Sequence, residues 1–265
     1  MQTIDLPLNQ KNIIITRSKD GIFDVKKIFI NKGANIYDLP ALSVGYPDNI
    51  NPLDEALNEI NDFHWIIFTS SNSIKFVDQR LRYLSKSLKE CSNQIKIAAV
   101  GEKTAKTLDE FGVRADFIPP EFIADSLIEN FPISGYGLKI FLPRVQTGGR
   151  DLIADQFRNA GSRVVEVAAY ETRCPDSIPK ETIDAIYDRK VDAIIFSSGK
   201  TVSNSAFLLE KEFGKEWRRF LDQAKILTIG PQTSKICEQI FNRVDGQASK
   251  YTFEGLLDLA IEIFN

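Results

Sequence analysis

Four short segments of this 265-residue chain recur in the same order at a nearly constant spacing. The members of each pair lie 127 to 129 residues apart, close to half the chain: IIITR (13–17) with IFLPR (140–144), IIFTS (66–70) with IIFSS (194–198), VGEKTA (100–105) with IGPQTS (229–234), and ADSL (124–127) with FEGL (253–256). Each match is weak alone, but four matches in one order at one offset indicate an internal duplication. We therefore expect two similar halves.

Short apolar, β-branched runs alternate along the chain with longer segments of helical period. Trp65–Phe68 and Ala193–Phe196 are runs of the first kind, and Ser73–Leu84 and Val202–Phe213 are segments of the second. Continuous apolar strands between amphipathic helices are typical of parallel sheets that are covered on both faces. The pattern predicts an α/β fold with two similar domains, each a parallel sheet flanked by helices.

Two extended segments, Asn35–Tyr46 and Ser162–Cys174, have no helical period and lie where one duplicated unit gives way to the next. Pro40 and Pro175 also disfavour helix nearby. We interpret the segments as two crossings between the domains that pair as a two-stranded β linker, which makes the first domain discontinuous. The predicted boundaries are 1–34 and 174–265 for domain 1, 42–163 for domain 2, and 35–41 and 164–173 for the linker strands.

The composition excludes several classes of protein. Lys and Arg number 33 against 36 Asp and Glu, so the net charge is −3, whereas nucleic-acid binders usually carry a basic excess. His64 is the only histidine, so no metal site with several histidine ligands can form. The three cysteines are odd in number and scattered, which favours reduced thiols over a disulfide framework.

Nothing in the sequence points to secretion or to a membrane. Residues 1–10 lack the basic and apolar regions of a secretory signal, and no stretch approaches the ~18 consecutive apolar residues of a membrane span. We expect a soluble cytoplasmic protein with no nucleic-acid or membrane partner. We also expect a monomer, because no exposed apolar stripe is evident.

Hydroxyl-rich turns follow two apolar strands at equivalent places in the duplication. Thr69, Ser70 and Ser71 follow one strand, and Ser197 and Ser198 follow the other. In open α/β sheets the ligand crevice lies beyond the carboxyl ends of the strands, where hydroxyls and helix N-termini favour anions. Ser and Thr are also ordinary N-caps, so each residue alone has a structural explanation.

The glycine turns VGEKTA and IGPQTS bring Thr104 and Thr233 to the starts of two helices. Neither turn has the full glycine fingerprint or the P-loop ending, so neither implies a nucleotide. Arg17 and Arg144 end corresponding strands, and Lys225 begins another. Such residues can bind a carboxylate, but a solvated surface charge is an equally ordinary role.

Tyr170 lies in the second predicted crossing. Strict alternation places Tyr170 with Glu166, Ala168 and Thr172 on the more polar face of that strand. A lone tyrosine is most often a partly buried packing residue. Because a phenol is protonated at neutral pH, Tyr170 is also a candidate proton donor.

Taken together, these motifs resemble the uroporphyrinogen-III synthase family almost from end to end: IIITR (13–17), LPALSV (39–44), IIFTSSNSI (66–74), AAVGEKTA (98–105), VAAYET (167–172), IIFSS (194–198) and TIGPQT (228–233). The resemblance implies two α/β domains joined by a two-stranded linker. It implies hydroxymethylbilane, with four acetate and four propionate groups, as the substrate, and transient hand-over from hydroxymethylbilane synthase. No metal or organic cofactor is expected.

The family reaction loses the substrate hydroxyl as water, and the resulting cation is attacked by the substituted carbon of ring D, so that the ring closes with ring D inverted. The resemblance makes Tyr170 the candidate that assists hydroxyl departure. It assigns substrate binding to Thr69, Ser70, Ser71, Thr104, Ser197, Ser198, Thr233 and Lys225, to which we add Arg17 and Arg144. The alternative is a two-domain protein that binds a small polyanion without transforming it.

Overall fold

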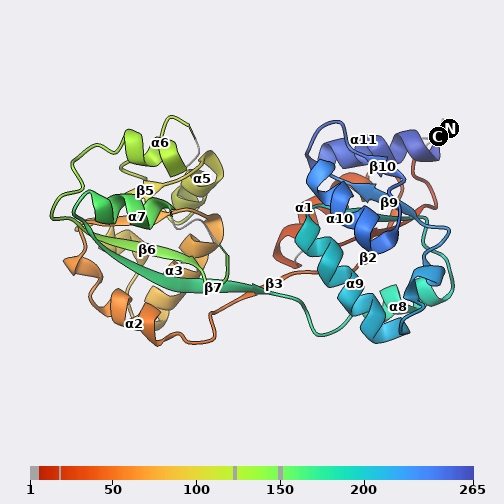
Figure 1. Cartoon of the computed structure of the whole chain (residues 1–265), viewed down its shortest axis with the longest axis horizontal. Coiled ribbons are helices and arrows are strands. Elements are labelled where there is room, and N and C mark those ends of the chain that lie inside the picture. Colours follow the sequence, from red (N-terminus) through yellow and green to blue (C-terminus); the bar gives the residue numbers. More distant parts are fainter. Residues whose placement is uncertain (1–5, 18, 122–123, 149–151) are drawn as a thin grey trace. The chain divides into compact units, whose positions relative to one another are not determined.

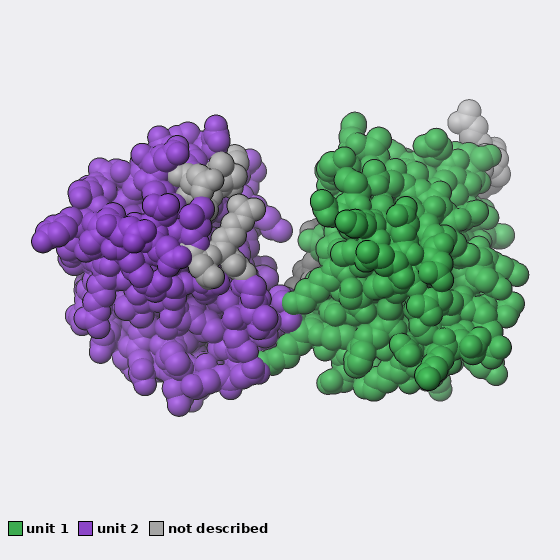
Figure 2. Space-filling model, in the orientation of Figure 1, with its two compact units in different colours: residues 1–43, 173–265 green, residues 44–172 purple. Residues whose placement is uncertain are grey.

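The protein divides into two compact units. The structure, a computed structural model, describes residues 6–17, 19–121, 124–148 and 152–265, so residues 1–5 of the first predicted domain lie outside it. Unit 1 comprises residues 1–43 and 173–265, and unit 2 comprises residues 44–172 (Figure 2). The chain therefore passes between the units twice, after Ser43 and after Thr172.

In the described part of unit 1, five strands form a sheet in the order β10-β9-β8-β1-β2, and the four neighbouring pairs are parallel. Figure 1 labels β10, β9 and β2 of this sheet. Its elements are β1 (Asn12–Ile15), α1 (Lys19–Ile30), β2 (Asn35–Asp38), α8 (Lys180–Tyr187), β8 (Ala193–Phe196), α9 (Gly199–Phe213), the 3₁₀ turn η2 (Trp217–Phe220), β9 (Lys225–Thr228), α10 (Pro231–Phe241), β10 (Gly246–Gln247) and α11 (Phe253–Phe264).

In the described part of unit 2, the sheet order is β3-β7-β6-β4-β5. Figure 1 labels β3, β7, β6 and β5 of this sheet. Its elements are β3 (Ser43–Gly45), α2 (Asn51–Asn58), the 3₁₀ turn η1 (Ile60–Asp62), β4 (Trp65–Phe68), α3 (Ser71–Tyr83), α4 (Leu88–Cys91), β5 (Lys96–Ala99), α5 (Glu102–Glu110), α6 (Ala124–Glu129), β6 (Lys139–Val145), α7 (Leu152–Asn159) and β7 (Arg163–Arg173). Parallel strands covered by helices confirm the predicted α/β class.

Strand side chains alternate between two apolar layers in each unit. In unit 1, Ile14 and Ile194 pack with α8, α9 and α10, whereas Ile13 and Ile195 pack with α1 and α11 on the other face. Unit 2 repeats this arrangement, with α2 to α5 on one face of its sheet and α6 and α7 on the other. Burial on both faces explains why the strands are continuously apolar.

The two sheets share one strand order, which is the structural form of the duplication. The order β9-β8-β1-β2 in unit 1 corresponds to β5-β4-β6-β7 in unit 2. The pairing of β10 beside β9 also has a counterpart, the isolated bridge between Ala98 of β5 and Phe117. The segments that match in sequence thus occupy matching positions in the two sheets.

The predicted linker segments are largely strands of the two sheets. Asn35–Asp38, within the predicted linker 35–41, is β2 and pairs in parallel with β1. The segment 164–173 is most of β7, which lies between β3 and β6 in unit 2. The two chain crossings are adjacent in this sheet, because β3 adjoins β7.

A β-bulge in β7 overturns the predicted alternation around Tyr170. Arg144 of β6 is opposite Ala168, but the next residue, Val145, is opposite Tyr170, so the register shifts by one residue. As a result Ala169 and Tyr170 both pack in the same apolar cluster as Val167. The prediction that Tyr170 lies on the polar face was wrong, because a bulge reverses the alternation beyond it.

None of the described helices is both long enough and apolar enough to cross a lipid bilayer.

The three cysteines are free, and burial raises the pKa of each thiol, that of Cys237 to about 12. A pKa raised by folding stabilises the protein below the unfolded pKa of the thiol, and this contribution is lost as the pH rises through the folded pKa. From about pH 9 to 12, wild type should therefore lose up to ~1.4 kcal/mol of unfolding free energy per pH unit relative to Cys237→Ala. Urea unfolding at pH 8 to 10.5 measures this difference, and parallel curves would contradict it.

Candidate functional site

The carboxyl edge of the sheet in unit 2 brings two predicted site residues into contact. Ser70 follows β4 and Tyr170 lies near the end of β7, and their hydroxyl oxygens are 3.1 Å apart in a hydrogen bond. Ser70 is also the N-cap of α3, since its Oγ accepts the Ser73 amide at 3.1 Å. One serine therefore fixes both the start of a helix and the hydroxyl of the tyrosine.

Apolar packing holds the Tyr170 ring in place. Tyr170 is only 8% exposed to solvent, and its ring stacks on the Phe76 ring with centroids 5.9 Å apart. Phe76 in turn meets the edge of the Tyr46 ring at 5.1 Å. Burial raises the pKa of the Tyr46 hydroxyl, while the Arg80 guanidinium opposes that rise. The cluster orients Tyr170, and its hydroxyl is the polar end.

A second group of hydroxyls lies at the neighbouring helix start of the same edge. The single hydroxyl proton of Thr107 in α5 is shared between two acceptors, Ser71 Oγ at 2.9 Å and the Lys103 carbonyl at 3.0 Å. Ser71 Oγ lies 3.4 Å from the same carbonyl. These bonds tie the start of α3 to the first two turns of α5. Thr104, in the first turn of α5, is buried, and Thr69 is half-buried.

Gly101, which begins the α5 turn, has a φ of 109°. This conformation favours glycine over all other residues, so the turn that precedes Thr104 depends on it.

Unit 1 repeats this construction at the carboxyl edge of its own sheet. Ser198 is the N-cap of α9 and accepts the Thr201 amide at 3.2 Å in a capping box. Ser197 beside it is half-buried, and Thr233 is buried in the first turn of α10. Arg17, after β1, lies over the Phe253 ring at 4.7 Å. Thus Arg17, Ser197, Ser198 and Thr233 all follow the carboxyl ends of strands in one sheet.

Lys225 is not brought together with these residues. It begins β9, about 10 Å from the carboxyl end of that strand at Thr228, and its Nζ lies 3.5 Å from Asp245. The same carboxylate accepts the Ile226 amide at 2.8 Å. The duplicated pair in unit 2 is the same, because Lys96 contacts Asp116, which accepts the Ile97 amide at 2.9 Å. Because the contact is repeated in both units, we assign Lys225 a structural role, in which it pairs with the aspartate that binds the backbone of β9.

Lys225→Ala is therefore expected to leave kcat and KM within about twofold of wild type, since an exposed ion pair contributes little. Lys96→Ala is the matched control, because it removes the equivalent contact in unit 2. Steady-state kinetics with both variants checks this. A KM raised tenfold by Lys225→Ala alone would restore the substrate-binding role.

Arg144 is engaged by a carboxylate of the adjacent strand. Its Nη1 lies 2.5 Å from Glu166, which also contacts Arg158 of α7 at 2.6 Å. A shallow pocket of about 250 Å³ is lined by Arg144, Glu166 and their strand neighbours. Arg144 lies at the carboxyl edge as predicted, but a substrate carboxylate would compete there with Glu166.

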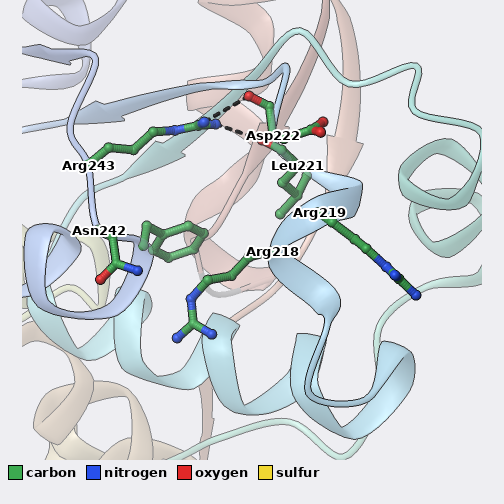
Figure 3. Close-up of a pocket in the computed structure, with 7 residues that line it drawn as sticks. Arg218, Arg219, Leu221, Asp222, Asn242 and Arg243 are labelled. Carbon is green, nitrogen blue, oxygen red and sulfur yellow. Dashed lines mark hydrogen bonds between the residues drawn. The ribbon is translucent and has the colours of Figure 1, made fainter.

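A larger pocket of about 310 Å³ in unit 1 lies near the amino end of β9, and three arginines, Arg218, Arg219 and Arg243, are among the residues that line it (Figure 3). Arg243 donates to the carbonyls of Leu221, Asp222 and Ala224, and Arg218 donates to the Ile240 carbonyl. The Arg218 and Arg219 side chains point in different directions (Figure 3). Arg218 and Arg243 bind backbone carbonyls, and the Arg219 guanidinium lies over the Phe220 ring at 5.9 Å, so we assign the pocket a structural role.

Sequence reasoning missed three residues of the unit 2 edge: Ser73, Phe76 and Thr107. Ser73 Oγ donates to the Ser70 carbonyl at 2.7 Å, as Thr201 does to that of Ser198 at 2.8 Å. The duplication held a signal for this pair, because each hydroxyl stands three residues after its cap. Phe76 and Thr107 carried no such signal, since their contacts depend on packing between helices.

Sequence comparison places the chain among known proteins. A family model described as "Uroporphyrinogen-III synthase HemD" matches residues 24–258. The uroporphyrinogen-III synthase of Synechococcus elongatus is 41% identical over 256 residues, which make up 97% of this chain and 96% of that protein.

Solved structures have the same fold. The uroporphyrinogen-III synthetase of Helicobacter pylori matches with a TM-score of 0.61 at 17% identity, over 96% of this chain and 99% of that one. A mutant uroporphyrinogen III synthase of Thermus thermophilus matches with a TM-score of 0.56 at 15% identity, over 96% and 98% of the two chains. At these identities the likeness concerns the fold.

The resemblance seen in the motifs is thus confirmed, and the interpretation as a binding protein without enzymatic activity is not favoured. The activity is that of a uroporphyrinogen-III synthase, an enzyme of tetrapyrrole biosynthesis. With a family model over most of its length and a close relative over nearly all of it, the chain belongs to the uroporphyrinogen-III synthase family.

Proposed function

We propose that this chain cyclises hydroxymethylbilane to uroporphyrinogen III with Tyr170 as the proton donor. The observation that carries the proposal is the hydrogen bond of 3.1 Å between the hydroxyls of Tyr170 and Ser70 at the carboxyl edge of a parallel sheet. A phenol that is packed on one side and hydrogen-bonded at its oxygen is held for proton transfer.

In the proposed reaction, the phenol of Tyr170 protonates the substrate hydroxyl as its carbon–oxygen bond breaks, and water leaves. The resulting azafulvene cation is attacked by the substituted carbon of ring D, and a spiro intermediate forms. This intermediate fragments and closes again with ring D inverted, and the proton released at closure returns to the phenolate. Ser70 donates to the phenolate oxygen in between. The net change is the loss of one water molecule.

The other site residues are proposed to bind the eight carboxylates of the substrate. Helix N-termini with hydroxyls attract anions. The starts proposed for this role are α3 and α5 in unit 2 and α9 and α10 in unit 1. The proposed contacts at the first pair are Thr69, Ser70, Ser71 and Thr104, and those at the second pair are Ser197, Ser198 and Thr233. Arg17 and Arg144 complete the proposed contacts. Binding these carboxylates would hold the linear substrate in a folded conformation, which brings the substituted carbon of ring D close to the azafulvene cation.

We also propose that the enzyme works as a monomer in the cytoplasm and receives hydroxymethylbilane by transient hand-over from hydroxymethylbilane synthase. We further propose that the two units are its functional domains. The division at Ser43 and Thr172 supports the last point. Sedimentation at assay concentration tests the monomer, and a change in that sedimentation on adding hydroxymethylbilane synthase tests the hand-over.

Counting turnovers tests whether the chain is an enzyme on this substrate. Hydroxymethylbilane, freshly generated by its synthase, is supplied in hundredfold excess over the chain, and its disappearance is followed against a sample without the chain. The proposal predicts that nearly all the substrate is consumed faster than it cyclises unaided. Consumption at the unaided rate would contradict the proposal, and stoichiometric protection of the substrate would instead favour a binding protein.

A further inference from the structure

Tyr251 is an aromatic side chain displayed to solvent at the carboxyl edge of the unit 1 sheet. It lies in the loop between β10 and α11 and is 65% exposed. Within the described residues its ring has neither an aromatic partner nor a hydrogen bond. We propose that the Tyr251 ring is a stacking surface for one pyrrole ring of the substrate, an inference that rests on the proposed function.

The glycine turn before α10 is shaped to seat this ring. Gly230 is buried and has a φ of 177°, an extended conformation that any residue can adopt, so its backbone does not require glycine. The need is for space. A Cβ at position 230 would lie 3.1 Å from Tyr251 Cδ1, 3.4 Å from Cε1 and 3.5 Å from Cγ. The ring thus lies directly against the Gly230 backbone.

The loop that carries Tyr251 is fixed on its other side as well. The Thr252 amide donates to the Lys250 carbonyl at 2.8 Å, and Thr252 Oγ1 accepts the Gly255 amide at 3.1 Å as the N-cap of α11. A Cβ on Gly255 would come within 2.2 Å of the Lys250 carbonyl oxygen, so α11 begins in close contact with the loop. Tyr251 is therefore exposed but held, which reduces the entropy lost when a ligand stacks on it.

The surroundings of Tyr251 suit a pyrrole that carries two carboxylates. The seat of the ring, Gly230, is the N-cap of α10, whose first turn holds Thr233. Two residues beyond Tyr251, the Phe253 ring lies under the Arg17 guanidinium at 4.7 Å. A flat, electron-rich ring can stack on tyrosine, while its acidic side chains bind the cation and the helix start.

The duplication gives independent support at the level of sequence. Phe122 stands 129 residues before Tyr251, the offset that relates the two glycine turns. Phe122 lies outside the described residues, so only its identity is used. An aromatic residue therefore recurs at the matching position in both halves of the sequence.

Steady-state kinetics on Tyr251 variants tests whether a pyrrole ring of the substrate stacks on Tyr251. We expect Tyr251→Ala to raise KM for hydroxymethylbilane about fivefold to tenfold, the size of one stacking contact, with kcat within twofold because the ring binds ground and transition states alike. Tyr251→Phe should behave as wild type. Phe207→Ala is the matched control, because Phe207 is also exposed on unit 1, at 60%, but lies on α9 away from its start.

Gly230→Ala gives a second measurement that keeps Tyr251 in place in the sequence. The added methyl group would lie 3.1 Å from the ring and push it by a few tenths of an ångström. KM should therefore rise, by less than in Tyr251→Ala, with kcat little changed, and thermal unfolding reports whether each variant folds. The inference is overturned if Tyr251→Ala folds and keeps the wild-type KM. If wild type itself does not convert hydroxymethylbilane, the proposed function fails instead, so the two failures are distinguishable.

Discussion

Replacing Tyr170 with phenylalanine is expected to lower kcat by about 10²-fold to 10⁴-fold, the range for loss of a general acid. The ring remains in the cluster with Phe76, so the fold and KM should change little. Only the oxygen that contacts Ser70 is removed. The measurement is single-turnover formation of cyclic product from freshly generated hydroxymethylbilane.

Tyr46→Phe is the matched control, because Tyr46 also packs against Phe76 but makes no contact with Ser70 among the described bonds. Its kcat should stay within twofold of wild type. If Tyr170→Phe turns over nearly as fast as wild type, Tyr170 is not the proton donor. If both variants are slow, turnover depends on the packing of Tyr46, Phe76 and Tyr170 and not on the Tyr170 hydroxyl alone.

Replacing Trp217 with alanine is expected to destabilise unit 1 by about 3–5 kcal/mol, as deletion of a fully buried indole does. Trp217 is 1% exposed, meets the Phe241 ring at 5.0 Å and lies under the Arg218 guanidinium. It joins η2 to the cluster formed by α8, α9 and α10. The cavity left there cannot collapse without moving those helices.

Urea unfolding measures this loss, with Phe207→Ala as the exposed control, expected within about 0.5 kcal/mol of wild type. Amide hydrogen exchange should show the faster opening in unit 1, while the strands of unit 2 keep their protection. A loss under 1 kcal/mol would show that Trp217 does not hold the unit 1 core together.

The fold was largely predictable, because the signals that specify it are repeated. Burial on both sheet faces gave β4 and β8 their uninterrupted apolar sequences, and the constant offset predicted that they are equivalent strands. The same repetition could have revealed the role of Lys225. Lys96 and Asp116 stand 129 residues before Lys225 and Asp245, so one ion pair is encoded twice.

The orientation of Tyr170 could not be predicted from the strand itself. Alternation in β7 is sound up to Ala168, and the bulge depends on how β7 pairs with β6 at Arg144 and Val145. One extra residue then turns Tyr170 from the polar face to the core, where Ser70 can reach it. The contact between the Tyr251 ring and the Gly230 backbone could not be predicted either, because it is a tertiary contact between residues with 20 others between them in the sequence.

The most direct test of the central claim, that this chain folds hydroxymethylbilane so that ring D inverts, is the isomer composition of its product. Freshly generated substrate is converted with and without the chain, the products are oxidised, and the porphyrin isomers are separated. The account predicts uroporphyrin III as the main isomer with the chain and uroporphyrin I without it. Isomer I alone in both samples would contradict the account.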